Sequence, residues 1–441
     1  MKKYLLTLYL ILITCMLAEN RPKIALVLSG GGSKGMAQVP TLQVIDSLNI
    51  PIDYVIGTSI GSITGALYSM GYSSDEILSE GLKTNWDIIY SNYKKREDLY
   101  FFQKNDYNKY PAIFNLKGIS PQAPMAITNG HASYMDLNSK FAVYELINDF
   151  NNFKIPFRCN AMDLLTGEEI IFDNGSISKA LRASSSIPSV FNPVDNDGSL
   201  LIDGGVCNNF PTDIAKKIGA DIVIGVNVSN SLRESSDINT IFDILRQTIS
   251  LNGLQKKIKN KEYVDILIEP QDLKSGSSYD NESLKNSYKS GQKAVYKEID
   301  KFLELQKKLN IENKSIILSS IKENDFIINS ILIKSNNKIN LNEIFPDYLY
   351  PFTISKESFL DRLSQIRKSK KYINFNYKLY DEVNGYKLIL YIEKKPSITI
   401  NNISIVGNKK LSESFIRDIL NINKDEQLDF NNLQSNIDKA Y

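Results

Sequence analysis

Residues 23–35 read KIALVLSGGGSKG, an unbroken apolar run that ends in a cluster of glycines. A strand buried on both faces has this pattern, and such strands belong to parallel sheets that helices cover on both sides. Helical patterns separate several further runs of the same type, which lie at 52–56, 155–162, 170–172, 200–202, 222–228 and 264–268. The alternation predicts an α/β fold with right-handed crossovers around a central, mostly parallel sheet. It ends near residue 305, after an amphipathic helix expected over about 288–303.

The glycine cluster, Gly30 to Gly35, precedes a helical pattern over residues 36–48. Glycines let successive backbone N–H groups converge on one point, and a helix N-terminus adds partial positive charge there. Such a loop binds either a phosphate or the oxyanion of a reaction intermediate. A dinucleotide fingerprint has similar glycines, but it requires an acidic residue at the end of the second strand, whereas Asp53 lies at the start of that strand. Lys34 is expected to be a solvated cation in this loop.

The second strand leads into Gly57-Thr58-Ser59-Ile60-Gly61, a G-x-S-x-G sequence at a strand-to-helix junction. A sharp turn of this type exposes the serine hydroxyl at the carboxyl edge of a sheet, and it requires small residues on both sides of the serine. Ser59 is therefore the candidate nucleophile. The alternative is a serine that caps the next helix in an ordinary tight turn.

An acidic residue follows a later strand, where Asp203 precedes Gly204 and Gly205. An aspartate at a turn usually bonds to its own backbone, but this one is the third of three glycine-rich turns in a consistent order. All three turns are expected at the carboxyl ends of parallel strands, where open α/β sheets place their sites. Asp203 is thus the candidate base.

His131 is the only histidine in the chain, and its position bears on the type of mechanism. A serine triad of the α/β-hydrolase type places its histidine after the acid, but His131 lies between Ser59 and Asp203. It follows Asn129 and Gly130 in a polar stretch, so we expect a surface or loop residue. The residues themselves therefore indicate a Ser–Asp dyad rather than a triad.

The three glycine-rich blocks together resemble the signature of the patatin-like phospholipase family, and the resemblance extends over residues 22–305. Supporting stretches are Pro156-Phe157-Arg158, Asp163 with Thr166-Gly167, residues 183–188, which read ASSSIP, and residues 208–211, which read NNFP. The resemblance implies a three-layer α/β fold and a Ser59–Asp203 dyad that cleaves phospholipids or other acyl esters. It also implies work at a membrane surface without a cofactor or a metal ion.

The same resemblance assigns roles to the glycine blocks. It implies an oxyanion hole in the loop of Gly30, Gly31 and Gly32, with the N–H groups of Gly31 and Gly32 as donors. The remaining motif positions that it implies are Lys34, Gly35, Gly57, Gly61, Gly204 and Gly205. Two positions depart from the pattern, because Gln38 and Pro40 stand where the family commonly has a histidine and a glycine. Pro40 would remove a helical hydrogen bond to Met36, so a kink is expected in the first crossover helix.

The first residues have the pattern of a secretory signal peptide, expected over residues 1–18. Met1 and two lysines precede an apolar run that is shorter than the roughly 20 residues of a membrane-spanning helix, and a buried first helix is the alternative. We expect export to the periplasm or outer membrane, with surface display or secretion left open, and Cys15 is a poor lipoprotein site. Cys159 and Cys207 would remain, and both are expected to be structural thiols.

Composition leaves the partner open. The chain has 52 Lys and Arg against 50 Asp and Glu, so no whole-protein field favours nucleic acid, and no nucleic-acid partner is expected. Three classes of function stay open: an esterase, a nucleotide-binding protein, and a catalytically idle outer-membrane assembly or interaction protein that acts through its tail.

The tail beyond residue 325 contains an internal echo, because INSILI at 328–333 recurs as INNISI at 400–405. Residues 325–395, which close with apolar runs at 373–379 and 386–392, resemble a polypeptide-transport-associated (POTRA) domain, a small α+β unit. Residues 398–441 resemble part of a second one. In outer-membrane proteins these units precede a β-barrel, so the resemblance implies a barrel beyond Tyr441. Since the second unit has only one strand, we expect residues from about 398 onward to be poorly ordered or loosely docked.

Overall fold

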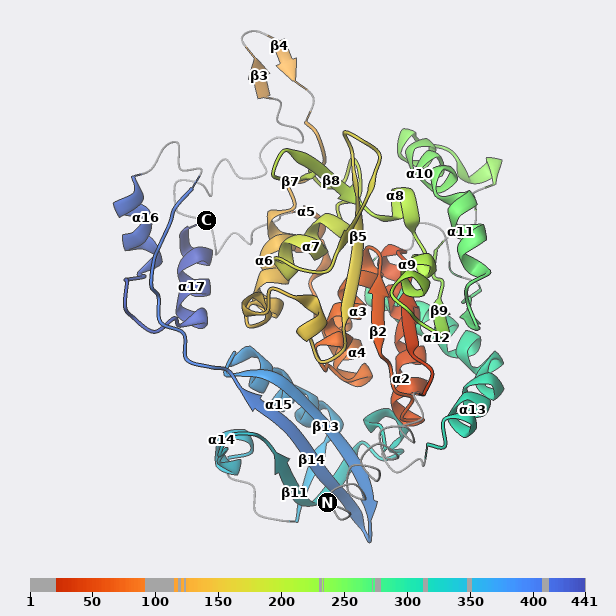
Figure 1. Ribbon diagram of the computed structural model, residues 1–441, viewed down its shortest axis with the longest axis vertical. Helices are drawn as coiled ribbons and strands as arrows, with labels where there is room; N and C mark the ends of the chain where they lie inside the picture. The colour runs from red at the N-terminus through yellow and green to blue at the C-terminus, as the bar shows by residue number, and fades with distance from the viewer. Residues whose placement is uncertain are drawn as a thin grey trace, which may run out of the picture.

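The computed structural model describes residues 21–91, 115–117, 120–122, 124–229, 232, 234–271, 273, 279–311, 316–346, 351–406 and 412–440. The signal peptide expected over residues 1–18, with Cys15, lies outside the described residues. Within these ranges, no helix is long and apolar enough to cross a membrane. The chain forms an α/β unit, a smaller α+β unit and a C-terminal pair of helices (Figure 1).

An eight-stranded sheet lies at the centre of the α/β unit. Its strands are β1 (Ile24–Leu28), β2 (Tyr54–Gly57), β5 (Phe157–Asp163), β6 (Glu169–Phe172), β7 (Val194–Asn196), β8 (Ser199–Asp203), β9 (Ile222–Val226) and β10 (Ile266–Ile268). Their order is β10-β9-β1-β2-β5-β8-β7, and β6 also pairs with β5. The strands from β10 to β5 are parallel, whereas β6, β7 and β8 are antiparallel to their neighbours. The predicted, mostly parallel sheet is confirmed, and β7 is the strand that the apolar runs did not predict.

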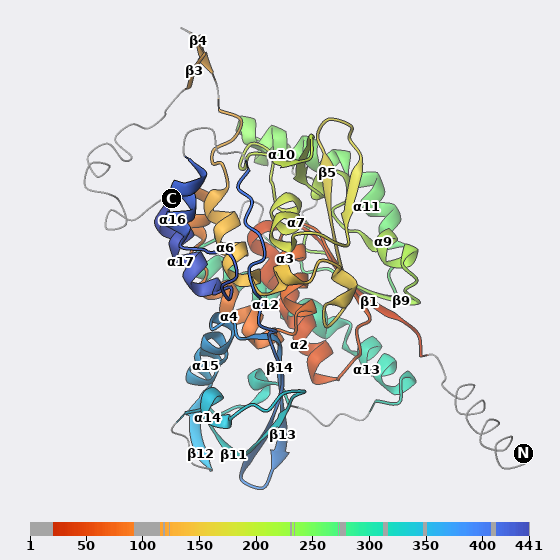
Figure 2. The ribbon, with the colours of Figure 1, turned by 60° about the vertical axis from the view of Figure 1, so that its left-hand side comes forward.

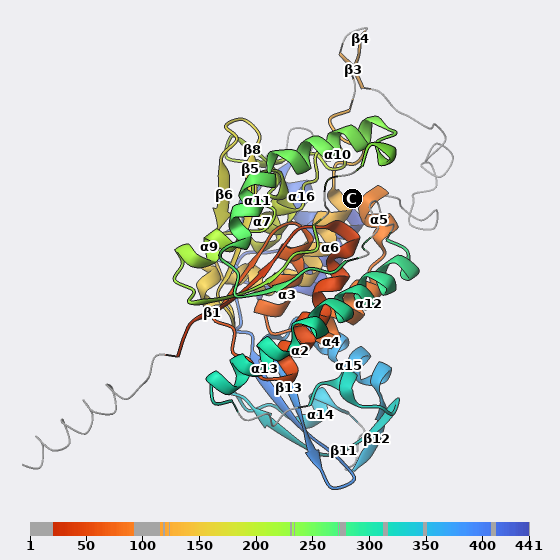
Figure 3. The ribbon, with the colours of Figure 1, turned by 90° about the vertical axis from the view of Figure 1, so that its right-hand side faces the viewer.

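Alternate residues of β1 face two different cores, which makes the unit three layers thick. Ile24, Leu26 and Leu28 pack into the larger core, and Ala25 and Val27 into the smaller one. The larger core is covered by α2 (Val39–Ser47), α3 (Ile60–Ser69) and α12 (Asn281–Lys297), and the smaller by α9 (Thr212–Lys217). Figure 3 shows the sheet between these two groups of helices.

Further helices surround these layers. They are α4 (Ser74–Lys83), α5 (Trp86–Ser91), α6 (His131–Phe141), α7 (Ile177–Ser184), α8 (Gly205–Asn208), α10 (Ile241–Asn252), α11 (Leu254–Lys261) and α13 (Ile299–Lys308). A separate hairpin joins β3 (Asn115–Lys117) to β4 (Ser120–Gln122). The single helix predicted over about 288–303 is in fact the pair α12 and α13, which meet at Glu298.

The first crossover differs from the predicted single helix over residues 36–48. A 3-10 helix, η1 (Gly32–Gln38), leads into α2, which begins at Val39. Pro40 thus lies in the first turn of α2, where a backbone N–H has no helical acceptor in any case. The predicted kink at Pro40 is therefore wrong, and the proline instead marks where the α-helix starts.

The α+β unit has its own sheet and its own core. The strands are β11 (Asp325–Lys334), β12 (Phe352–Ser355), β13 (Tyr372–Glu382) and β14 (Gly385–Lys394), in the order β12-β11-β14-β13. Helices α14 (Leu341–Ile344) and α15 (Lys356–Lys368) supply Ile344, Phe359 and Leu363 to this core. The strands predicted at 328–333, 373–379 and 386–392 are confirmed. The assignment of this unit to the POTRA type stays a prediction.

A buried ion pair joins the two units where α15 packs on α4 (Figure 1). The guanidinium of Arg367 pairs with Glu76 at 2.6 Å, and only 7% and 4% of the two side chains are exposed. The same guanidinium lies 3.6 Å above the ring of Tyr72. Removing one partner of a buried pair typically costs about 3–5 kcal/mol, because the other charge stays buried and unpaired. This contact therefore fixes the α+β unit against the α/β unit.

The C-terminal helices are α16 (Glu413–Leu420) and α17 (Phe430–Ala440), which Figure 2 brings to the front. The strand predicted at 400–405 is not formed. Instead the N–H of Ile400 donates to the Glu426 carbonyl, and the N–H of Asp425 donates to the Ile400 carbonyl. No residue of α16 is buried. The loose docking expected from residue 398 onward stays a prediction.

Candidate active site

Ser59 lies in a sharp turn between β2 and α3. Its backbone has φ 53° and ψ −126°, which is a strained conformation for a residue with a side chain. The chain comes very close to itself here: a Cβ on Gly57 would lie 2.3 Å from the Gly61 carbonyl oxygen, and a Cβ on Gly61 would lie 2.3 Å from that of Leu28. Both glycines of the G-x-S-x-G sequence are therefore required by the close packing of the turn.

Ser59 and Asp203 are brought together by the fold, although they are far apart in sequence. The hydroxyl of Ser59 donates to Oδ2 of Asp203 at 2.6 Å. The N–H of Gly205 donates to Oδ1 of the same carboxylate at 2.7 Å and fixes its orientation. Both side chains are buried, with 6% of each residue exposed. The pair thus has the geometry of a nucleophile and its base.

The strand that ends at Asp203 runs in the direction opposite to the predicted one. β8 runs antiparallel to β5, so Asp203 does not end a parallel strand. β5 extends beyond β2, because Gly57 is level with Cys159 whereas Asp203 is level with Ala161. β8 therefore starts beyond the edge of the parallel strands and runs back toward it, and its last residue reaches the turn that holds Ser59.

Burial controls the charge of the Asp203 carboxyl. It raises the pKa of Asp203 to about 6, although the hydrogen bonds from Ser59 and Gly205 oppose the shift. The group is still ionised at neutral pH. Because its pKa is closer to neutrality than that of an ordinary aspartate, it is a stronger base than a solvent-exposed carboxylate.

The glycine loop lies beside this pair. The N–H of Gly30 donates to the Asn209 carbonyl at 3.2 Å, so Gly30 is not a free donor for an oxyanion. The N–H groups of Gly31 and Gly32 have no acceptor in the described part of the chain. Gly32 has φ +60°, a conformation that glycine adopts without strain. Gly31 and Gly32 therefore stay the predicted donors, whereas the N–H of Gly30 is already bonded.

The sequence profile described as patatin-like phospholipase matches residues 26–216. The match includes the glycine loop, Ser59 and Asp203. Residues 26–216 are therefore similar in sequence to the patatin-like phospholipase family.

Curated relatives match the same part of the chain. A lysophospholipase nte1 of Aspergillus niger is 27% identical over 207 residues, which cover 47% of this chain and 12% of that protein. A patatin-like phospholipase domain-containing protein 7 of Rattus norvegicus is 30% identical over 224 residues, covering 50% and 14%. The chain thus spans about an eighth of the length of these relatives.

Solved structures overlap partially. VipD from Legionella pneumophila is 14% identical, with a TM-score of 0.35, and the overlap covers 64% of this chain and 67% of that one. ExoU in its complex with SpcU from Pseudomonas aeruginosa is 15% identical, with a TM-score of 0.30, covering 64% and 52%.

The structure bears on three alternatives to the Ser59–Asp203 pair: a helix-capping serine, a dinucleotide site with Asp53, and a triad with His131. The Ser59 side chain does not cap α3, because its hydroxyl bonds to Asp203 instead. Asp53 lies at the start of β2, where its carboxylate binds Arg21 at 2.7 Å, far along the strand from the glycine loop. His131 is the first residue of α6 and is half-buried, so it belongs to a helix rather than a loop. Ser59 and Asp203 bond directly to each other without it.

Lys34 and Gln38 of η1 are both buried beside the glycine loop. Lys34 is only 4% exposed within η1, so the expectation of a solvated cation is wrong. Gln38 is fully buried, and its Nε2 donates to the Ser29 carbonyl at 2.8 Å. The side-chain amide of Gln38 thus ties η1 to the end of β1.

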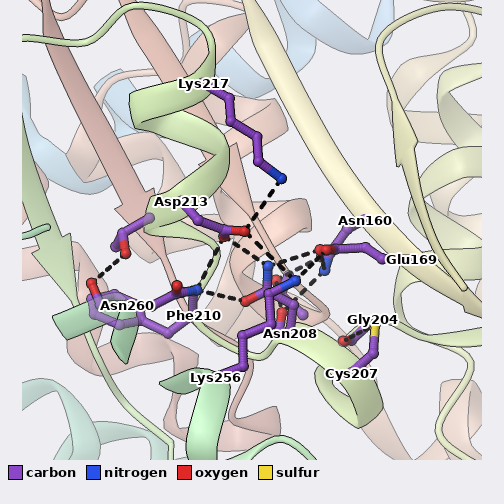
Figure 4. A network of polar contacts seen from close by, with 12 residues as sticks. Asn160, Glu169, Gly204, Cys207, Asn208, Phe210, Asp213, Lys217, Lys256 and Asn260 are labelled. Carbon is purple, nitrogen blue, oxygen red and sulfur yellow. Dashed lines mark hydrogen bonds and ion pairs between the residues drawn. The ribbon is translucent and has the colours of Figure 1, made fainter. Parts of the chain in front are cut away.

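A polar network beneath the site was not predicted. Figure 4 shows Asn160 and Asn208 converging on Glu169, to which each donates at 2.8 Å. Thr58, which precedes the nucleophile, donates to Asn160 Oδ1 at 2.7 Å. A Cβ on Gly204 would lie 2.4 Å from the Asn160 carbonyl oxygen. The network therefore positions both turns of the dyad, and its sequence signal is a lone Asn within the apolar run at 155–162.

Two cavities meet at Ser59. The first, of about 80 Å³, is lined mainly by aliphatic and aromatic side chains of α3, α4, α5 and α6. The second, of about 200 Å³, is more polar and is lined by Lys34, Asp203, Asn209 and Lys257. Within the described ranges, no three His, Cys, Asp or Glu side chains lie close enough together to hold a metal ion. The site thus offers an apolar side and a cationic side to one substrate.

The remaining thiols do not take part in this geometry. Cys159 is fully buried in β5, and Cys207 donates weakly to the Gly204 carbonyl at 3.4 Å. Both are free, and burial raises the pKa of each thiol above its usual range. A buried, protonated thiol such as that of Cys159 is unreactive.

Proposed function

We propose that this chain is a serine-dependent lipid ester hydrolase of the phospholipase A type, in which Ser59 is the nucleophile and Asp203 the general base. One observation carries the proposal: the strained Ser59 hydroxyl donates at 2.6 Å to a buried carboxylate whose pKa is raised to about 6. The match to the patatin-like phospholipase family and the lysophospholipase relatives support lipid esters as the substrate class.

The first half of the reaction transfers the acyl group to the enzyme. The Ser59 oxygen attacks the ester carbonyl carbon while its proton passes to Oδ2 of Asp203. The carbonyl oxygen becomes an oxyanion, to which the N–H groups of Gly31 and Gly32 donate; each such donor is worth roughly 3 kcal/mol. When the tetrahedral intermediate collapses, the alcohol leaves with the proton from Asp203.

The second half releases the acid. Asp203, again ionised, takes a proton from a water molecule that attacks the acyl-enzyme carbonyl. A second oxyanion forms in the same hole. Its collapse breaks the bond to Ser59, whose oxygen recovers the proton from Asp203, and the fatty acid leaves. The dyad needs no histidine, since one carboxyl carries the proton in both halves.

The two cavities indicate how a lipid lies in the site. The apolar cavity suits the acyl chain, and the polar cavity suits the head group, because Lys34 and Lys257 line it. Lys257 lies on α11, and its ammonium donates to the Ser229 hydroxyl at 3.2 Å. Burial lowers the pKa of Lys257, and the neighbouring Lys261 adds to the shift. An anionic head group would offset the cost of burying the Lys257 charge, and this favours phosphate-bearing lipids.

Replacement of Lys257 tests the head-group assignment. Lys257→Met is expected to lower kcat/KM by about tenfold for a lysophospholipid with an anionic head group, because a charge-assisted hydrogen bond is lost. Hydrolysis of an uncharged short-chain ester should stay within about twofold. The matched control is Lys261→Met on the same helix, whose ammonium pairs with Glu269 at 2.6 Å and does not line the cavity. Equal losses on both substrates would remove Lys257 from head-group recognition.

Export to the cell envelope is a second part of the proposal, and it rests on the pattern of residues 1–18 alone. Export requires that the mature protein begin near residue 19, and mass spectrometry of the protein from its host cells measures this. A retained Met1 would contradict it. The POTRA-like assignment of residues 325–395 rests on the order of strands and helices, and this unit is joined to α4 by the Arg367–Glu76 ion pair.

A further inference from the structure

The apolar cavity beside Ser59 lies between three helices of the α/β unit. Its walls include the faces of α3 from Ile60 to Leu67, of α4 and its C-cap residue from Ile77 to Thr84, and of α6 from Ser133 to Lys140, and α5 adds Trp86, Ile89 and Tyr90. Residues three and four apart lie on one face of a helix, so each helix contributes a continuous stripe about 10 Å long. The length of these stripes therefore limits the length of the acyl chain that the cavity can hold.

A third cavity, of about 260 Å³, lies between α4 and α6 on one side and α15 of the α+β unit on the other. Ser364, Arg367 and Lys368 of α15 line it. The residues that line both this interdomain cavity and the apolar cavity are Glu80, Thr84, Asp136 and Lys140. These four residues, the polar wall, separate an apolar space that reaches Ser59 from a polar space that does not.

Contacts on both sides hold the polar wall in place. The ammonium of Lys140 pairs with the Asp136 carboxylate one turn earlier on α6. The Glu80 carboxylate accepts a hydrogen bond from the Ser364 hydroxyl at 3.3 Å, so the α+β unit fixes one member of the wall. An alkyl chain that crossed the wall would strip water or partners from these charged groups, which is unfavourable. A chain that ends before the wall gains binding energy with each buried methylene.

We propose that the polar wall sets the longest acyl chain that the enzyme accepts, with Lys140 as the specificity-determining residue and the docked α+β unit as its support. This inference rests on the proposed esterase function. The substrate class that follows is an ester whose acyl chain fits within the apolar cavity. Longer chains become substrates only when the wall opens into the interdomain cavity.

The test is a series of p-nitrophenyl esters with acyl chains of increasing length, hydrolysed by the full chain. For wild type, kcat/KM should rise about fourfold per methylene until the cavity is filled and then stop rising. Lys140→Ala should carry the rise several carbons further, so that the ratio of long-chain to short-chain kcat/KM increases by about tenfold or more. The matched control is Lys368→Ala, which removes a lysine that lines the interdomain cavity but not the apolar one.

Trp86 provides a readout that does not depend on turnover. It is the only tryptophan in the chain, it lines the apolar cavity and it stacks on Tyr279 with ring centroids 4.6 Å apart. Fatty acids of increasing length should change its fluorescence, and their affinity should stop rising at the same chain length as the ester kinetics. Lys140→Ala should move both limits together.

The possible outcomes distinguish failure of the polar wall from failure of the esterase function. Ester hydrolysis with the same chain-length limit in wild type and Lys140→Ala would overturn the wall and leave the esterase intact. An equal shift in Lys368→Ala would also overturn it, because that lysine lies outside the apolar cavity. If no ester is cleaved but Trp86 reports fatty-acid binding with a limit that Lys140→Ala extends, the wall stands and the esterase function fails.

Discussion

Ser59→Ala is expected to abolish ester hydrolysis, with a loss of at least about 10⁴-fold in kcat, because it removes the hydroxyl that donates to Asp203. The substitution removes one buried oxygen from a turn and leaves the glycines that form it. The melting temperature should therefore change by only a few degrees. Both quantities are measured on the same preparation, so a loss through unfolding is recognised directly.

The control for this prediction is Ser185→Ala. Ser185 also lines the apolar cavity, but its hydroxyl donates to the Leu181 carbonyl at 2.8 Å. Its removal should leave kcat within severalfold of wild type. If Ser59→Ala keeps more than about a tenth of the wild-type rate, Ser59 is not the nucleophile.

Asp203→Asn is expected to lower kcat by about 10⁴-fold, the scale that follows loss of the acid in a serine triad. The amide fits the same space but cannot accept the proton of Ser59. In wild type, the base must be ionised, so kcat/KM should fall as the pH drops below the Asp203 pKa of about 6. His131→Gln should keep turnover within severalfold, and a reversal of the two effects would mean that the dyad is wrong.

Stability provides an independent check on the same substitution. Because burial raises the pKa of Asp203 above its unfolded value, the folded state favours the protonated form. The stability that this provides is fully present below the unfolded pKa and is lost as the pH rises through about 6. Asn carries no charge at any of these pH values. Asp203→Asn should therefore melt at a higher temperature than wild type at pH 8, and the difference should shrink toward pH 5.

The site residues could be predicted from the sequence because each lies in a tight turn that requires glycine at fixed positions. Gly57 packs against Gly61 within the turn, and Gly61 packs against the end of β1, so both appear as a short motif around Ser59. After Asp203, Gly205 lies against the Asp203 carboxylate in the same turn, whereas Gly204 is required by the backbone of Asn160 on β5. The apolar runs located the strands, since a strand buried on both faces has no polar positions.

Features that depend on contacts far apart in sequence could not be predicted. The reversed direction of β8 is set by its pairing with β5, and nothing in residues 200–202 records it. Lys34 becomes buried only when helices from elsewhere in the chain cover the loop, so its charge alone wrongly predicts an exposed side chain. The polar wall depends on Ser364 meeting Glu80, residues that lie in separate units. Local patterns carry no information about such pairs.

The central claim is that Ser59 is a nucleophile activated by Asp203, and covalent labelling by a fluorophosphonate tests it most directly. The intact protein, treated at pH 8 and digested, should carry one phosphonyl group on the peptide that contains Ser59. The label should be absent in Ser59→Ala and should form far more slowly in Asp203→Asn. A label on another serine, or an unlabelled wild-type protein, would contradict the account.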